Sequence, residues 1–199
     1  MIFPYDSWNP LSVTEIDHLF RNAPFKWGLA GGYAVEQFLG TSIRKHSDID
    51  IIVFRNDQYR LYQWLTNWAL YAADPPGTLR AWQPTEWLAP SIHDIWAHQV
   101  NARAWQFQIM IVDIEGDRWV SRRHPQICGL QTDLIVTYHQ LPCIRIEVQL
   151  LYKAKAQREK DWHDFQSCLP HLSVTAKVWL KQALELAHPE GHPWHDLIP

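Results

Sequence analysis

Residues 27–54 read WGLAGGYAVEQFLGTSIRKHSDIDIIVF, and this stretch decides the fold. Its first apolar residues end at a glycine pair, Gly31 and Gly32, where the backbone can turn sharply because no side chain obstructs it. The following residues predict a helix as far as Leu39, with Gly40 as its stop signal. Backbone N–H groups at such a helix start can bind a phosphate group. The segment therefore predicts a strand, a sharp turn and a helix start that a phosphate can approach.

Two aspartates enter the apolar strand predicted for residues 48–54. Because successive side chains of a strand alternate between its faces, Asp48 and Asp50 point to one side and Ile49 to the other. Neighbouring carboxylates repel each other unless a cation lies between them. Asp48 and Asp50 are therefore the candidate metal ligands and the candidate catalytic pair.

The acidic spacing alone does not identify a metal site, because it recurs at Glu15 and Asp17 and at Asp113 and Glu115. A glycine pair before a helix can likewise be an ordinary turn. The order of the parts is more specific: strand, glycine pair, helix, basic loop over residues 44–47, and then aspartates in a second strand. That order indicates a site for a nucleoside triphosphate and its metal ions.

In this order of parts the sequence resembles the nucleotidyltransferase superfamily that includes DNA polymerase β-like enzymes. The likeness is closer to small bacterial members, the aminoglycoside 2''-adenylyltransferases and lincosamide nucleotidyltransferases. Their pattern of Gly-Gly, short helix, Arg-x-His-x loop and Asp-x-Asp is matched, in order, by Gly31, Gly32, Arg44, His46, Asp48 and Asp50. Residues 105–123 resemble the family's later hairpin, and residues 147–165 resemble its C-terminal helical segment. The likeness covers most of the chain.

The resemblance implies an α+β fold (mixed α/β), with a nucleotidyltransferase-like mixed β-sheet and packed helices over residues 1–140 and a small C-terminal helical region over residues 141–199. It implies an enzyme that transfers a nucleoside monophosphate, AMP from ATP, to a hydroxyl of a small molecule such as an aminoglycoside-type antibiotic. The co-substrate is ATP or another nucleoside triphosphate, and two Mg²⁺ ions are expected with it.

The resemblance also assigns roles to single residues. The residues expected to bind the nucleotide are Gly31, Gly32, Arg44, His46 and Lys153. The residues expected to bind the acceptor are Gln108, Glu147, Asp161 and Asp164. Other roles stay open from the residues alone: Arg44 as a surface cation, His46 as a cap of its loop, Glu147 as an exposed side chain, and the segment 153–164 as a solvated helix face with ordinary ion pairs.

Members of this family usually add a third acidic residue from a later strand, as a metal ligand or as a base for the acceptor hydroxyl. Two positions compete for that place. Asp113 ends the apolar strand that starts at Trp105, whereas Gln108 lies where a carboxylate is expected if Trp105 sets the register. The two have opposite parity, so a regular strand cannot turn both toward one site. With Gln108 in that place the acceptor loses its base, and activity is expected to be reduced or lost.

Two other functions stay open. A toxin-like nucleotidyltransferase would act on tRNA or protein, and toxins of the abortive-infection type have a lysine, a Lys/Arg-Asp pair and a further Asp similar to residues 153–164. A non-catalytic homologue would keep the fold to bind a nucleotide or small ligand, and Gln108 favours it. A metal hydrolase is not favoured, because Pro189 and Pro193 interrupt the tail histidines His188, His192 and His195.

Composition agrees with a compact enzyme of 199 residues, 47% hydrophobic, with twelve tryptophans and a net charge of −3. The charge gives no support for a protein that grips a nucleic-acid backbone. Cys128, Cys143 and Cys168 are far apart, which fits reduced thiols. The N-terminus does not read as a signal peptide, and no apolar run reaches the ~20 residues of a spanning helix. We expect a soluble, cytoplasmic protein without a membrane partner.

The remaining pattern predicts a mixed sheet of four to six strands with helices packed on it, and then a helical region. The predicted strands cover residues 25–30, 48–54, 78–82 and a hairpin over 105–113 and 118–121. The predicted helices cover residues 12–22, 57–72, 147–157, 160–168 and 173–186. Residues 91–98 stay ambiguous. The active cleft is expected between the sheet and the C-terminal helices.

Overall fold

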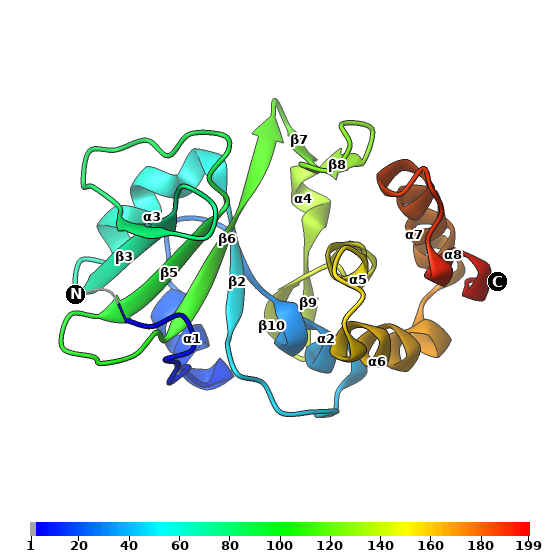
Figure 1. Ribbon diagram of the computed structural model, residues 1–199, viewed down its shortest axis with the longest axis horizontal. Helices are drawn as coiled ribbons and strands as arrows, with labels where there is room; N and C mark the ends of the chain where they lie inside the picture. The colour runs from blue at the N-terminus through cyan, green and yellow to red at the C-terminus, as the bar shows by residue number, and fades with distance from the viewer. Residues whose placement is uncertain (1–2) are drawn as a thin grey trace.

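The computed structural model describes residues 3–199 and has a mixed α/β architecture (Figure 1). Within these residues ten strands join one sheet, in which the order of the main path is β4-β3-β5-β6-β2-β1-β10-β9, and the short strands β7 and β8 extend from β6. The strands are β1 (Trp27–Ala30), β2 (Asp50–Phe54), β3 (Trp68–Ala73), β4 (Leu79–Ala81), β5 (Asp94–Gln99), β6 (Phe107–Glu115), β7 (Arg118–Val120), β8 (Cys128–Leu130), β9 (Ile135–Tyr138) and β10 (Leu141–Ile144).

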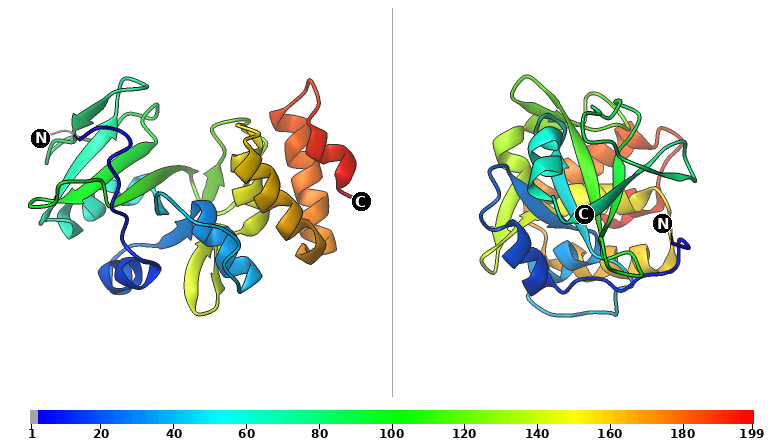
Figure 2. Two further views of the ribbon diagram at one scale, coloured as in Figure 1. Left: turned by 60° about the horizontal axis from the view of Figure 1, so that its bottom comes forward. Right: turned by 90° about the vertical axis from the view of Figure 1, so that its left-hand side faces the viewer.

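The helices divide into two groups. The first group precedes β3 or links strands: α1 (Val13–Phe20), α2 (Gly31–Leu39), η1 (Arg55–Asp57), α3 (Gln58–Trp64) and the short α4 (Gln131–Leu134). The second group is C-terminal: α5 (Ile146–Ala154), α6 (Glu159–Cys168), η2 (Leu169–His171), α7 (Val174–Ala187) and α8 (Pro193–Leu197). Figure 2 shows the C-terminal helices gathered at one end and β3 to β6 at the other, with α2 between them. Helix α2 contacts both α5 and α6.

The predicted strand, turn and helix of residues 27–39 are present. Strand β1 runs antiparallel to β2, which places Ala30 opposite Asp50. Gly31 begins α2 with φ +64°, and Gly40 ends it with φ +70°, so glycine occupies the left-handed backbone region at both ends. The opening helix also begins as predicted, because Ser12 caps α1 in a reciprocal box with Glu15.

The two faces of the central strands differ in burial. Ile51, Ile95 and Ile109 are neighbours on one face and are fully buried. Helix α1 covers this face, where Phe20 packs edge-on against Phe107 with ring centroids 5.8 Å apart. Each such side chain stabilises the fold by about 1.5–3 kcal/mol through burial. On the opposite face Ile52 is also fully buried, but Asp50, Asp94 and Gln108 are only half-buried, and polar side chains collect at this end of the face.

The structure corrects the prediction of one long helix over residues 57–72. Helix α3 ends at Trp64, and Trp68–Ala73 forms β3, paired with β4 and β5. A short apolar run fits a buried helix and a strand equally well, and here pairing with β4 on one side and β5 on the other stabilises the strand. The ambiguous residues 91–98 contain all of β5 except its last residue, Gln99, and the sheet is larger than the predicted four to six strands.

The C-terminal region also begins with sheet. Leu141–Ile144 is β10, which pairs in parallel with β1 through Leu29 and Cys143, and the helices start at Ile146. The three cysteines are free. No helix among residues 3–199 combines the length and apolar character needed to cross a membrane.

Candidate active site

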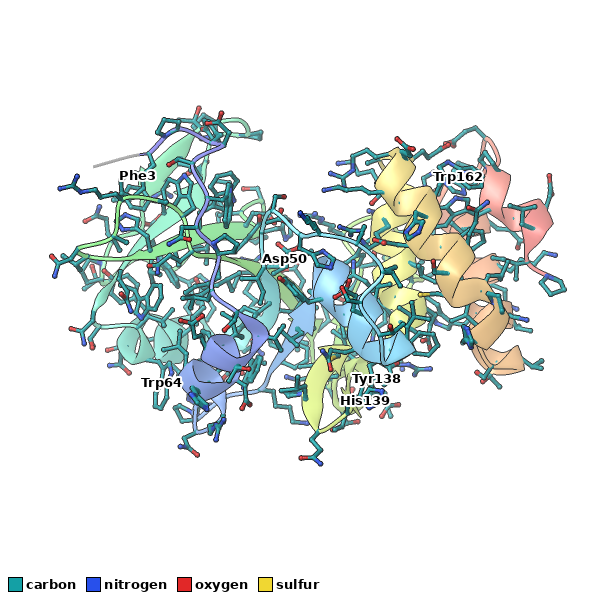
Figure 3. The ribbon with its side chains drawn as sticks, turned by 90° about the horizontal axis from the view of Figure 1, so that it is seen from below. Phe3, Asp50, Trp64, Tyr138, His139 and Trp162 are labelled. Atoms are coloured by element: carbon teal, nitrogen blue, oxygen red, sulfur yellow. The ribbon has the colours of Figure 1, made fainter. Side chains whose placement is uncertain are left out.

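Asp50 is the first residue of β2 and lies at the centre of the molecule, between the strands and the C-terminal helices (Figure 3). Asp48 precedes it by two residues and is also half-buried. The carboxylate of Asp50 touches the turn before α2, because a Cβ added to Gly31 would lie 2.1 Å from Asp50 Oδ2. The bare backbone of Gly31 is therefore what admits this carboxylate to the helix start.

Burial, together with the neighbouring charge of Asp48, raises the pKa of Asp50 to about 7, although Lys153 acts in the opposite direction. A carboxyl group whose ionised form is this disfavoured gains from a nearby cation. Among residues 3–199 no three His, Cys, Asp or Glu side chains already converge as a metal cage. Two hard oxygen ligands at and just before the start of β2 suit Mg²⁺, which is commonly held by one or two carboxylates together with substrate phosphates.

The second glycine is packed against the basic loop. A Cβ on Gly32 would lie 2.2 Å from His46 Cε1 and 2.7 Å from Arg44 Nη2. The N–H of Gly31 donates to Gln149 Oε1 at 2.8 Å. Thus Gly32 lies beside Arg44 and His46, two of the residues expected to bind the nucleotide, and Gln149 of α5 adds a contact to Gly31 that the sequence did not reveal.

Glu36 of α2 organises this loop. Its Oε1 accepts from Ser42 Oγ at 2.9 Å and from the N–H of Ile43 at 2.8 Å, and it lies 3.0 Å from His46 Nε2. Burial opposes the charge of Glu36, but these hydrogen bonds outweigh it and hold its pKa below the ordinary value. On the other side of its ring, His46 Nδ1 lies 3.0 Å from Arg44 Nη1. His46 therefore links α2 to Arg44.

The residues predicted on the C-terminal helices come together in a buried charge network. Asp164 receives two hydrogen bonds from Arg44, both of 2.8 Å, and an ion pair from Lys153 Nζ at 2.7 Å. Burial disfavours the ionised form of Asp164, yet Arg44 and Lys153 hold its pKa below the ordinary value. Asp161 is fully buried as well, 3.8 Å from Lys153 and bonded by Arg158. Both acids are engaged by cations of the chain itself.

The structure differs from the sequence expectation at Asp113. Strand β6 lies beside β2 with Gln108 opposite Asp50, and Asp113 is farther along the strand on the other parity. The carboxylate of Asp113 is bonded by the buried Arg55, and His93 lies 3.6 Å from it. Register and this ion pair therefore keep Asp113 away from the aspartate pair.

Gln108 and Glu147 also have defined surroundings. The amide Nε2 of Gln108 donates to Asp94 Oδ1 on β5 at 3.0 Å. Glu147 is buried and paired with Arg145, and it lines a pocket that contains neither Asp50 nor Lys153. Gln108 thus borders the site, whereas Glu147 belongs to a different surface.

Asp94 is the acidic residue that the sequence interpretation missed. It lies on the same face of the sheet as Asp50 and Gln108, since Trp96 of its strand is opposite Gln108. The alternation of Asp94 and Trp96 with the apolar Ile95 and Ala97 is the signal that could have identified a strand with a polar face.

Comparison with known proteins places this geometry in a family. The profile of the aminoglycoside-2''-adenylyltransferase family matches residues 12–168. The chain belongs to this family. A search of curated protein sequences finds no significant match.

Two solved structures share the fold of this member of the aminoglycoside-2''-adenylyltransferase family. The lincosamide antibiotic adenylyltransferase LnuA, bound to lincomycin, superposes with a TM-score of 0.54 at 20% identity, over 80% of this chain and 97% of its own. ANT(2'')-Ia in complex with adenylyl-2''-tobramycin gives a TM-score of 0.54 at 14% identity, over 86% and 95%. At this identity the likeness shows the fold.

Family membership confirms the resemblance drawn from the glycine pair and the aspartates. It also confirms the predicted class, because the family consists of nucleotidyltransferases that take a nucleotide co-substrate. The matched region includes Asp48 and Asp50 and ends at Cys168, the last residue of α6.

Proposed function

We propose that this enzyme transfers an adenylyl group from Mg²⁺-bound ATP to a hydroxyl of a small, antibiotic-like acceptor. The observation that carries the proposal is the carboxylate of Asp50 against the bare turn at Gly31, with the charges of Asp48, Lys153 and Lys160 acting on it. Lys153 and Lys160 lie on helices α5 and α6, whereas Asp50 lies on the sheet. This arrangement of cations and carboxylates suits a triphosphate with its metal ions.

The residues divide the work by position. Asp48 and Asp50 would hold up to two Mg²⁺ ions, which supply neutralisation of charge on the phosphate oxygens. Lys153, buried on α5, would contact the phosphates as a point charge when it turns from Asp164. Arg44 keeps a fixed position because Asp164 binds its guanidinium through two nitrogens.

The charge of the site favours an acceptor with few positive groups. Asp161 and Asp164 were expected to bind a cationic acceptor, but each is buried and bonded to cations of the chain. On the open face of the sheet, Asp94 has Arg122 at 3.8 Å. A lincosamide-type acceptor therefore suits the site better than a polycationic aminoglycoside.

The test is transfer of label from α-phosphate-labelled ATP, with Mg²⁺, to lincomycin and tobramycin in parallel, with pyrophosphate release measured. Asp48→Asn and Asp50→Asn should each lower the rate by at least about 100-fold, since several kcal/mol of charge stabilisation is lost. Asp117→Asn, in the exposed turn between β6 and β7, is the matched control and should keep the wild-type rate. Unchanged rates in both site variants would remove the pair from the mechanism.

A non-catalytic nucleotide-binding role is the second candidate, and Gln108 favours it because an amide lies opposite Asp50 where a carboxylate was expected. Calorimetric binding of ATP·Mg²⁺ without pyrophosphate release, with any acceptor, would support that role. Label appearing on RNA or protein would instead indicate the toxin-like acceptor.

A further inference from the structure

We propose that Asp94 of β5 is the catalytic residue that takes the proton from the acceptor hydroxyl, and that Gln108 of β6 positions it. The inference rests on the proposed function, since it concerns the attacking group of that reaction. It assigns the base to a strand one step farther from β2 than the position expected from the sequence.

The geometry begins with the strand register. Gln108 is the neighbour of Asp50 across β2 and β6, and its amide cannot accept a proton from a hydroxyl at neutral pH. Its Nε2 donates instead to Asp94 Oδ1 at 3.0 Å, which fixes one oxygen of that carboxylate. The other oxygen faces Arg122 at 3.8 Å, beyond hydrogen-bond distance, so it can still accept a proton.

Asp94 also acts electrostatically on Asp50, and its side chain is partly open to solvent. Its negative charge contributes to raising the pKa of Asp50, so the two carboxylates share one electrostatic environment. Its side chain is 32% exposed, on the half-buried face of the sheet, whereas Asp161 and Asp164 are at 0%. A hydroxylated acceptor can reach Asp94 without displacing a buried ion pair.

The other carboxylates predicted for the site do not suit the role. Asp113 is bonded by Arg55 on the opposite parity of β6, and Glu147 is buried and paired with Arg145. Asp48 and Asp50 would be occupied by metal ions in the proposed complex. Apart from the two proposed metal ligands, Asp94 alone of these carboxylates combines partial exposure with the face of Asp50.

In the proposed step, the Asp94 carboxylate accepts the acceptor's hydroxyl proton while the hydroxyl oxygen forms a bond to the α-phosphorus. The bond from the α-phosphorus to the α,β-bridging oxygen breaks, and pyrophosphate leaves with that electron pair. The products are the adenylylated acceptor, pyrophosphate and protonated Asp94, which returns its proton to water.

The test begins with Asp94→Asn, which keeps an oxygen for the Gln108 hydrogen bond and removes only the basic carboxylate. We expect kcat for transfer to lincomycin or tobramycin to fall by about 10²–10⁴-fold. The Kd for Mg²⁺ with α,β-methylene-ATP, measured by calorimetry, should change less than about 3-fold. Asp117→Asn is the control for loss of one negative charge.

A second variant tests whether a carboxylate on this face of the sheet is what the reaction requires. Asp94→Asn combined with Gln108→Asp returns a carboxylate to the open face, opposite Asp50, and should recover at least about 10-fold of the lost kcat. A wild-type kcat in Asp94→Asn would overturn the inference while the proposed function stands, and so would a loss of rate matched by an equal loss of nucleotide affinity. A wild-type protein that labels no acceptor would remove the proposed function first, and the role of Asp94 with it.

Discussion

Gly31 shows how one missing side chain shapes the site. Any other residue at this position would be destabilised in two ways. Its backbone would have to adopt a φ of +64°, and its Cβ would lie 2.1 Å from Asp50 Oδ2. Gly116 has nearly the same φ, +63°, with nothing within 4 Å. We predict that Gly116→Ala lowers the free energy of unfolding by about 1 kcal/mol, from the left-handed backbone alone. Gly31→Ala should cost about 2–3 kcal/mol and also weaken ATP·Mg²⁺ binding, because Asp50 must move. Urea unfolding measures the free energy of unfolding of each variant, and calorimetry measures its binding of ATP·Mg²⁺. Equal losses of both quantities in Gly31→Ala and Gly116→Ala would contradict the role given to the turn.

The same scale shows what the sequence could and could not predict. Gly31, Asp48 and Asp50 were identifiable because their relation is local, within one turn and two strands that are consecutive in the chain. Asp94 was not, because its place beside Gln108 depends on the pairing of β5 with β6, which no short spacing encodes. The pairing of Arg55 with Asp113 was hidden for a similar reason, since it joins side chains 58 residues apart.

At the scale of elements, α6 anchors the basic loop to α5 through one carboxylate. Asp164 is at 0% exposure and holds Arg44 and Lys153. Asp164→Asn removes the carboxylate that Arg44 and Lys153 share and leaves Lys153 only the more distant Asp161, so we predict a loss of about 3 kcal/mol in the free energy of unfolding. Because the folded pKa of Asp164 lies below its ordinary value, this contribution is present above about pH 4 and is lost as the pH falls through the lowered pKa.

The comparison for that prediction is the surface pair of α1. Asp17 and Arg21 are four residues apart on the helix, and the Arg21 side chain is 47% exposed. Asp17→Asn should therefore cost less than about 1 kcal/mol. Chemical unfolding at pH 7 and pH 3 measures both variants. If Asp164→Asn were as mild as Asp17→Asn at pH 7, the network would be an ordinary solvated face, as one interpretation of the sequence allowed.

The largest error of the sequence interpretation is the single helix predicted for residues 57–72. The apolar residues between Asp57 and Ala72 suit a helix by spacing, but those after Trp64 complete a sheet whose partners, β4 and β5, come later in the chain. Helices α5, α6 and α7 were predictable because their signals are local, including the Ser173 cap of α7. Local signals therefore defined helices better than they defined strands.

At the scale of the whole molecule, the sheet and the C-terminal helices are joined by β10, which pairs with β1, and by Arg123, which donates to the carbonyls of Leu151 and Tyr152 at the end of α5. Burial lowers the pKa of Arg123 to about 10, so this cation stays charged at neutral pH. With strand pairing and a half-buried cation across the junction, we predict that both ends unfold as one cooperative unit. Native-state hydrogen exchange followed by mass spectrometry should give similar opening free energies for β2, β6 and α5. Arg123→Ala should lower all of them together, because the Leu151 and Tyr152 carbonyls lose their donor. Early exchange of α5 to α7 alone would show instead that the cleft lies between two independently stable parts.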